Sequence, residues 1–141
     1  MPLNNWQLAG GIIHWRSYAQ KTTALSSTEA EYMALSDCSK QAIWIKTLIE
    51  ELGFHLIAIP IYGDNQGVIF IASNAVQESC TKHIDIQYYY IRELINAKQV
   101  KLMFVPGEMN PANIFTKNLM QVKFTHFQNQ MGLDFKAIKS T

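Results

Sequence analysis

The sequence predicts an α/β layered domain. Two observations carry this prediction. Apolar residues make up 48% of the 141 residues and charged residues 16%, which is typical of a folded chain with one core. Short apolar runs also alternate with segments of helical spacing, in the expected order β-β-α-β-α-α-β-α-α. Strands that alternate with helices favour a layered α/β architecture.

Residues 6–11 and 12–20 read as two short strands. Gly10 and Gly11 lie where they meet, and glycine adopts the positive backbone angles that tight hairpin turns require. We therefore expect an antiparallel hairpin at the start of the chain.

The segment "ALSSTEAEYMAL" begins a long helix. Ser26 or Ser27 can cap it, and Ser26 with Glu29 fits a capping box. Apolar residues then follow at steps of three and four, at positions 32, 35, 38, 42, 45, 49 and 52. Gly53 suits the residue after a helix, so the helix is expected to end at Leu52.

The segment 56–65, "LIAIPIYGDN", reads as a buried strand whose carboxyl end lies at Asp64. Pro60 weakens this interpretation because proline cannot donate to a strand ladder, so the strand is expected to begin after it. The following "NQGVIFIAS" predicts a short helix.

The second half of the chain predicts two more helices around a strand. Residues 82–98 form a helix with Ile84, Tyr88, Ile91 and Ile95 on one face. Residues 100–105 form a strand, and Asn110 caps the turn "PANIFTK", with Pro111 in its first position. The last helix, "QVKFTHFQNQMG", is expected to turn Phe124, Phe127 and Met131 inward.

Composition excludes several classes of protein. The net charge of +1 and the pI of about 7.8 are not those of a dedicated nucleic-acid binder. Cys38 and Cys80 lack metal-ligand spacing, and a buried free thiol is expected at Cys38. The start lacks a signal-peptide pattern and the apolar runs are too short to span a membrane. An intracellular protein of the cytoplasm or nucleus is expected.

Asp64 is the best single candidate for a functional site. It follows an apolar strand and precedes a helix, and ligands of open α/β sheets gather at the carboxyl ends of strands. A turn or capping role is the alternative. Glu29, Glu31 and Asp85 lie in the first turns of helices, where acids also complement the helix dipole, and this simpler reading is preferred for Glu29 and Asp85.

Two carboxylates near a strand end can hold a divalent cation. Two such cations together activate water and stabilise the leaving oxygen in phosphodiester cleavage. Glu31 and Asp64 supply two negative charges against the four positive charges of two magnesium ions. We therefore expect one weak Mg²⁺ site at most, or none.

Four segments together, "ALSSTEAEYMAL", "YGDNQ", "TKHIDIQYYYIRE" and "NPANIFTK", resemble the ribonuclease H domain of copia-type LTR retrotransposon polyproteins. The resemblance covers about residues 6–119 and leaves 120–141 as a C-terminal helix and tail. It implies that residues 1–141 form a single ribonuclease H-like domain, with a mixed central sheet flanked by helices.

The resemblance also implies a chemistry. Active members of the family cut the RNA strand of an RNA–DNA hybrid with four acidic residues and two magnesium ions. Glu31 matches the acid on the family's first helix, and Asp64 in "GDNQ" matches the acid after its fourth strand. Asn113 stands where the last acid belongs. No segment of the chain matches the family's first strand, which carries the remaining acid, so Glu31 and Asp64 are expected to be vestigial.

The family's first strand is also central in its sheet. Without it, two strand edges lose their partners, and each buried unpaired backbone group costs about 1–3 kcal/mol. The total stability of a domain is only about 5–15 kcal/mol, so something is expected to fill the gap. The candidates are a second copy in a homodimer, a strand-donating protein partner, or a hairpin that slides inward.

Three functions follow from these expectations. The first is a catalytically inactive interaction or self-association module, with weak hybrid binding at best. The alternative is a residual metal-dependent endonuclease that cleaves the RNA strand of RNA–DNA hybrids through Glu31, Asp64 and Asn113. The third is a fragment of a longer polyprotein without a function of its own.

Overall fold

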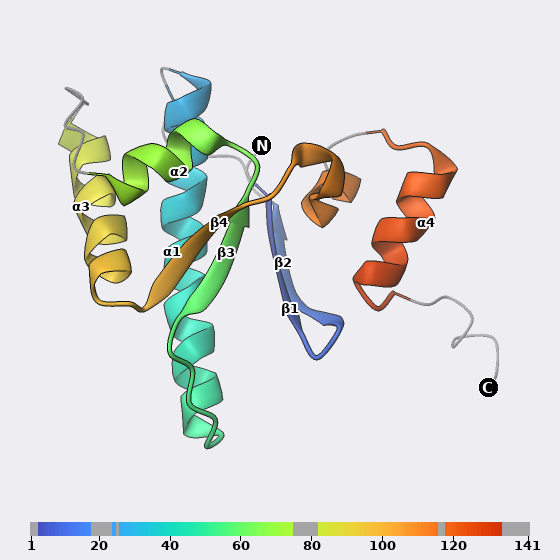
Figure 1. The fold of residues 1–141 in the computed structure, drawn as a ribbon, viewed down its shortest axis with the longest axis horizontal. Helices are drawn as coiled ribbons and strands as arrows, with labels where there is room; N and C mark the ends of the chain where they lie inside the picture. The colour runs from blue at the N-terminus through green and yellow to red at the C-terminus, as the bar shows by residue number, and fades with distance from the viewer. Residues whose placement is uncertain (1–2, 18–23, 25, 75–81, 116–117, 134–141) are drawn as a thin grey trace. The chain divides into compact units, whose positions relative to one another are not determined.

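The computed structural model describes residues 3–17, 24, 26–74, 82–115 and 118–133 (Figure 1). Contacts divide the chain into two compact units. One unit holds residues 21–106, and the other joins residues 1–20 to 107–141. No helix in the described ranges is long and apolar enough to cross a membrane.

The unit of residues 21–106 combines three helices with a parallel pair of strands. Its elements are α1 (Ser27–Glu51), β3 (Ile59–Gly63), α2 (Gln66–Ser73), α3 (Lys82–Asn96) and β4 (Val100–Phe104). The other unit contains a hairpin of β1 (Leu3–Leu8) and β2 (Gly11–Ser17), the 3-10 helices η1 (Gly107–Met109) and η2 (Pro111–Phe115), and α4 (Gln121–Gln130). The expected order of strands and helices is confirmed, except that η2 is a 3-10 helix.

Helix α1 has the ends that local sequence signals predict. The Ser26 hydroxyl accepts a hydrogen bond from Glu29 N–H at 3.1 Å, which caps the first turn. Gly53 adopts φ +89°, and the N–H groups of Gly53 and Phe54 donate to Glu50 and Ile49 carbonyls in a Schellman arrangement. Leu52, however, is 67% exposed, so the apolar stripe ends before it.

Strand β3 includes Pro60, contrary to the expectation that the strand begins after it. The N–H of Ile59 donates to Gln99, and the carbonyl of Gly63 accepts from Val105. In a parallel ladder alternate residues bond the same neighbour, so the odd-numbered residues of β3 bond β4. The position of Pro60 faces away from β4, where its missing N–H leaves no gap in the ladder.

The core of this unit forms where α1, α2 and α3 meet. Tyr32, Val68, Ala72 and Ile91 are buried in one cluster, and the partly buried Leu35, Ile71, Tyr88, Tyr90, Ile95 and Leu102 pack against it. The rings of Tyr32 and Tyr88 stack with their centroids 5.9 Å apart, which joins α1 to α3. The inward face expected for α3 is therefore confirmed at Tyr88, Ile91 and Ile95; the side chain of Ile84 lies outside the described residues.

The hairpin unit is built around Trp6, Phe127 and Met131, which are buried. Strands β1 and β2 pair antiparallel, with a register shift between Trp6 and Gln7. Ile12 N–H donates to the Met131 carbonyl at 3.2 Å, which fastens the end of α4 to β2. The inward orientation expected for Phe124 is wrong, since its side chain is 43% exposed and Phe127 is the one buried residue of this short helix.

The described strands pair as two separate two-stranded sheets, β1 with β2 and β3 with β4. The molecule is thus mixed α/β with small sheets and four α-helices in the described ranges. One continuous mixed central sheet, and a single ribonuclease H-like domain over residues 1–141, stay predictions.

Candidate functional site

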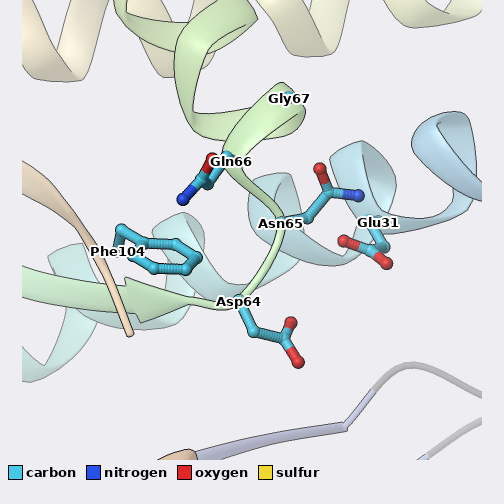
Figure 2. Close-up of a pocket in the computed structure, with 6 residues that line it drawn as sticks. All are labelled: Glu31, Asp64, Asn65, Gln66, Gly67 and Phe104. Carbon is cyan, nitrogen blue, oxygen red and sulfur yellow. The ribbon is translucent and has the colours of Figure 1, made fainter. Parts of the chain in front are cut away.

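Glu31 and Asp64 line the same surface depression in the unit of residues 21–106. Glu31 lies near the start of α1, and Asp64 directly follows the last residue of β3. The depression has a volume of about 460 Å³ and is lined by Glu31, Asp64, Asn65, Gln66, Gly67 and Phe104. Figure 2 shows both carboxylates pointing into the open space beside the Asp64–Asn65 turn. Two acids that lie on different elements are thereby brought together.

The turn that carries Asp64 is held by its neighbour. Asn65 is the N-cap of α2, and its side-chain oxygen accepts a hydrogen bond from Val68 N–H at 3.1 Å. This oxygen is therefore engaged in the helix cap. The capping role left open for Asp64 belongs instead to Asn65, and the Asp64 carboxylate extends into solvent.

Sequence reasoning does not identify four of the lining residues: Asn65, Gln66, Gly67 and Phe104. Gln66 and Gly67 continue the "GDNQ" turn into the first turn of α2. Phe104 ends β4 and pairs in register with Gly63, the last residue of β3. Because the carboxyl ends of parallel strands meet at one edge of a sheet, parallel pairing of these two strands would have predicted Phe104.

The donor set of the depression suits one hard cation and not two. Mg²⁺ is bound in proteins through one or two carboxylates, with water completing its octahedral shell. Glu31 and Asp64 are exposed and supply two carboxylates. In the described part of the chain, no group of three or more His, Cys, Asp or Glu side chains is placed to hold a metal ion. A two-metal centre does not fit these residues.

Asn113 lies in the other unit, on η2, and is only 8% exposed. Its side-chain nitrogen Nδ2 donates a hydrogen bond to the Gly107 carbonyl oxygen, and its main-chain N–H donates to Asn110 at 3.1 Å. Asn110 in turn accepts a hydrogen bond from Ala112 N–H through its side chain, as expected for the residue that caps this turn. The amide of Asn113 therefore holds the loop that joins η1 to η2.

The remaining acids and thiols take simpler roles. Glu29 lies in the first turn of α1, where its N–H meets the cap. Cys38 is a free thiol, as expected, but the residue is half-buried and not fully buried. Desolvation of the thiol, followed by the nearby negative charge of Asp37, raises the pKa of Cys38 to about 12. The side chain of Asp85 and the whole of Cys80 lie outside the described residues.

Comparisons with known proteins point to transposons. The chain is 38% identical over 125 residues to the retrovirus-related Pol polyprotein from transposon TNT 1-94 of Nicotiana tabacum, a match that covers 89% of the chain. The chain is 36% identical over 122 residues to the Pol polyproteins from transposons RE2 and RE1 of Arabidopsis thaliana, and each of these matches covers 86% of the chain. The chain spans only 9% and 8% of the lengths of these relatives.

No model of a protein family matches the chain, and no solved structure matches it. The retrotransposon resemblance of the motifs agrees with the relatives, since most of the chain is similar to part of a transposon Pol polyprotein. The names of the relatives do not specify which part of the polyprotein this is. The assignment to its ribonuclease H portion therefore stays a proposal.

Proposed function

We propose that these 141 residues form a retrotransposon-derived ribonuclease H-like domain that does not cleave nucleic acid and acts as an interaction or self-association module. Its origin is supported by the Pol polyprotein relatives and by the four motifs that resemble the ribonuclease H family. Glu31 and Asp64 are vestigial metal ligands in this proposal, and Asn113 occupies the position of the family's last acid.

The observation that carries the loss of cleavage is the hydrogen bond of Asn113. Its Nδ2 donates to the Gly107 carbonyl, a bond that only the amide can make at neutral pH. An ionised carboxylate there would face a carbonyl oxygen, and both groups are acceptors. The loop thus supports the amide, and Asn113 behaves as a structural residue of this chain.

The second support is the charge of the depression. Two carboxylates balance one Mg²⁺, whereas two-metal hydrolysis requires ligands that hold both ions a few ångströms apart. A single Mg²⁺ that keeps most of its water would bind weakly at Glu31 and Asp64. Such an ion, held by Glu31 and Asp64, would supply Lewis acidity from one side only, whereas two ions together would stabilise both the attacking and the leaving oxygen.

The test is a cleavage assay on the full 141-residue chain. An RNA–DNA hybrid labelled on its RNA strand is incubated with the protein and Mg²⁺, beside the Asp64→Asn variant. We expect no cleavage above the level of Asp64→Asn. Mg²⁺-dependent cleavage that the substitution abolishes would overturn the proposal, and equal cleavage by both proteins would identify a contaminating nuclease.

Self-association is tested separately, by light scattering on a sizing column. The chain has a mass of 16.1 kDa, and we expect twice this value. A monomer over the whole concentration range would remove self-association from the proposal and leave the result of the cleavage assay untouched.

One observation favours the residual endonuclease as a second candidate: Glu31 and Asp64 share one depression (Figure 2). In this candidate one Mg²⁺ at the two carboxylates gives slow cleavage of the RNA strand. NMR titration with Mg²⁺ separates it from simple binding. Shifts at residues 31 and 64 without cleavage indicate a vestigial site, whereas shifts with cleavage that both disappear in Asp64→Asn support the endonuclease.

A further inference from the structure

The hydrogen bonds between β3 and β4 determine which main-chain groups lie on the outer edge of β3, the edge away from β4. Ile59 N–H donates to Gln99 at 3.0 Å, and Val105 N–H donates to the Gly63 carbonyl at 2.9 Å. These two bonds fix the alternation of β3, whose odd-numbered residues bond β4. The main-chain groups of Pro60 and Tyr62 therefore point the opposite way, along the outer edge.

This edge is open within its unit. In the described part of residues 21–106, β3 has β4 as its one ladder neighbour. The side chains of Ile59 and Ile61 are buried, which holds the strand in place, while Pro60 is exposed and Tyr62 is 58% exposed. Strand edges of this kind pair readily with another chain unless they are covered. Within β3 the edge offers one donor, Tyr62 N–H, and the carbonyl oxygens of Pro60 and Tyr62; by the same alternation Asp64 N–H follows directly after the strand.

The helices of the unit leave room for a partner. Helices α2 and α3 both contact β4, and Figure 1 shows α3 on the β4 side of the pair, away from the outer edge of β3. Helix α1 contacts both strands.

We propose that the outer edge of β3 binds the same edge of a second copy of this chain, as an antiparallel pair centred on Tyr62. This inference rests on the self-association in the proposed function and names its surface. In this register Tyr62 exchanges both main-chain hydrogen bonds with the partner's Tyr62. Asp64 N–H donates to the carbonyl of the partner's Pro60, and the same bond forms in the other direction by symmetry. Together these main-chain bonds join the two parallel strand pairs into a four-stranded sheet.

A second copy is the occupant because the edge complements itself. The central donor, Tyr62 N–H, meets the carbonyl of its own counterpart across the two-fold axis. Pro60 has no main-chain N–H, and in this register only its carbonyl oxygen forms a hydrogen bond. The two Tyr62 rings lie side by side as a cross-strand aromatic pair. Asp64 lies opposite a proline, so the two carboxylates are not placed directly across from each other.

The experiment compares wild type with Tyr62→Pro and Tyr62→Thr by sedimentation equilibrium. Tyr62 N–H is not used by β4, so proline at this position leaves the β3–β4 ladder intact, as Pro60 already does. It removes the donor of both central hydrogen bonds of the dimer, and we expect the dimer dissociation constant to rise at least tenfold. Threonine retains the N–H and suits a strand, so Tyr62→Thr is expected to remain dimeric. Circular dichroism checks that both variants fold.

Hydrogen exchange provides the second readout. Exchange of the Tyr62 and Asp64 amides is expected to slow as wild-type protein concentration rises through the dimerisation range, with no such change in Tyr62→Pro. A Tyr62→Pro variant that folds and dimerises like wild type would overturn this edge as the surface and leave self-association standing. A wild-type monomer whose Tyr62 amide is protected only when another protein is added would overturn the second copy as occupant.

Discussion

Asn113 donates a hydrogen bond from its side-chain amide to the main-chain carbonyl of Gly107, six residues earlier in the chain. The contact joins Asn113 to the start of the loop that carries it. It explains why the amide is suited to this fold, since the partly buried carbonyl oxygen of Gly107 gains a second donor beside the main-chain N–H of Asn110. A carboxylate at position 113 is therefore expected to weaken this loop.

The substitution Asn113→Asp is expected to destabilise the chain by about 1–3 kcal/mol at pH 7, because the Gly107 carbonyl loses its side-chain donor and keeps only the main-chain N–H of Asn110 at 3.4 Å. The introduced carboxyl can donate only when protonated, so its pKa is higher in the folded state. The folded state then binds the extra proton, and the loss of stability grows as pH rises above the unfolded value of about 3.9. Urea unfolding at pH 3 and pH 7 measures this, and a loss of stability that is equal at both pH values would contradict it.

Lys46 is buried at 6% exposure, and its Nζ lies 2.7 Å from Gln99 Oε1. Lys46→Met is expected to cost about 1–3 kcal/mol, because the amide oxygen of Gln99 loses its donor. Adding Gln99→Leu removes that acceptor, so the double variant should be less destabilised than the sum of the single ones. Urea unfolding of all three variants gives the coupling energy, and strict additivity would argue against the bond.

The matched control for this pair is Lys40→Met. Lys40 forms an exposed ion pair with Asp37 at 3.2 Å, and such pairs contribute about 0–1 kcal/mol. A loss at Lys40 as large as that at Lys46 would mean that removal of charge, and not the buried hydrogen bond, destabilises the helix.

Gly132 and Gly53 both adopt positive φ but differ in their surroundings. A Cβ at Gly53 meets nothing within 4 Å, whereas one at Gly132 would lie 2.5 Å from the Gly10 carbonyl oxygen. Gly53→Ala is expected to cost about 1–2 kcal/mol for its backbone conformation alone. Gly132→Ala should cost more, because the hairpin must also move. Thermal unfolding compares the two, and equal losses would contradict the close approach.

The Cys38 thiol is expected to resist modification in the folded protein. Burial raises its pKa to about 12, and the thiolate is the reactive form, so roughly one thiol in ten thousand is ionised at pH 8. A disulfide reagent should therefore label Cys38 rapidly in urea and slowly in buffer. The measurement uses a Cys80→Ser background, so that all labelling reports Cys38. Rapid labelling in buffer would show that the thiol is accessible and ionised.

Local signals in the sequence determined the helix ends. Ser26 and Gly53 act through hydrogen bonds to residues a few positions away, and such short-range interactions are readable from sequence alone. The hairpin turn at Gly10 follows for the same reason. The candidate pair Glu31 and Asp64 also follows from sequence, through motif resemblance and the position of Asp64 after a strand.

Burial at the margins of helices required the tertiary structure. Leu52 and Phe124 fit the apolar periodicity of their helices, yet both are substantially exposed. Periodicity identifies the face of a helix that turns inward, but which turns of that face meet a neighbour depends on where the neighbouring element ends. Burial at these positions is a property of packing between distant segments.

Sequence alone thus determined the element types, the helix caps and the candidate acids, because these depend on local conformation and on residue chemistry. Only the tertiary structure decided that β3 pairs with β4, that Pro60 faces the open edge, and that Asn113 donates to Gly107. It also brought Glu31 and Asp64 to one depression with Phe104. These relationships depend on long-range packing and on the alternation of a strand ladder, which local sequence patterns do not encode.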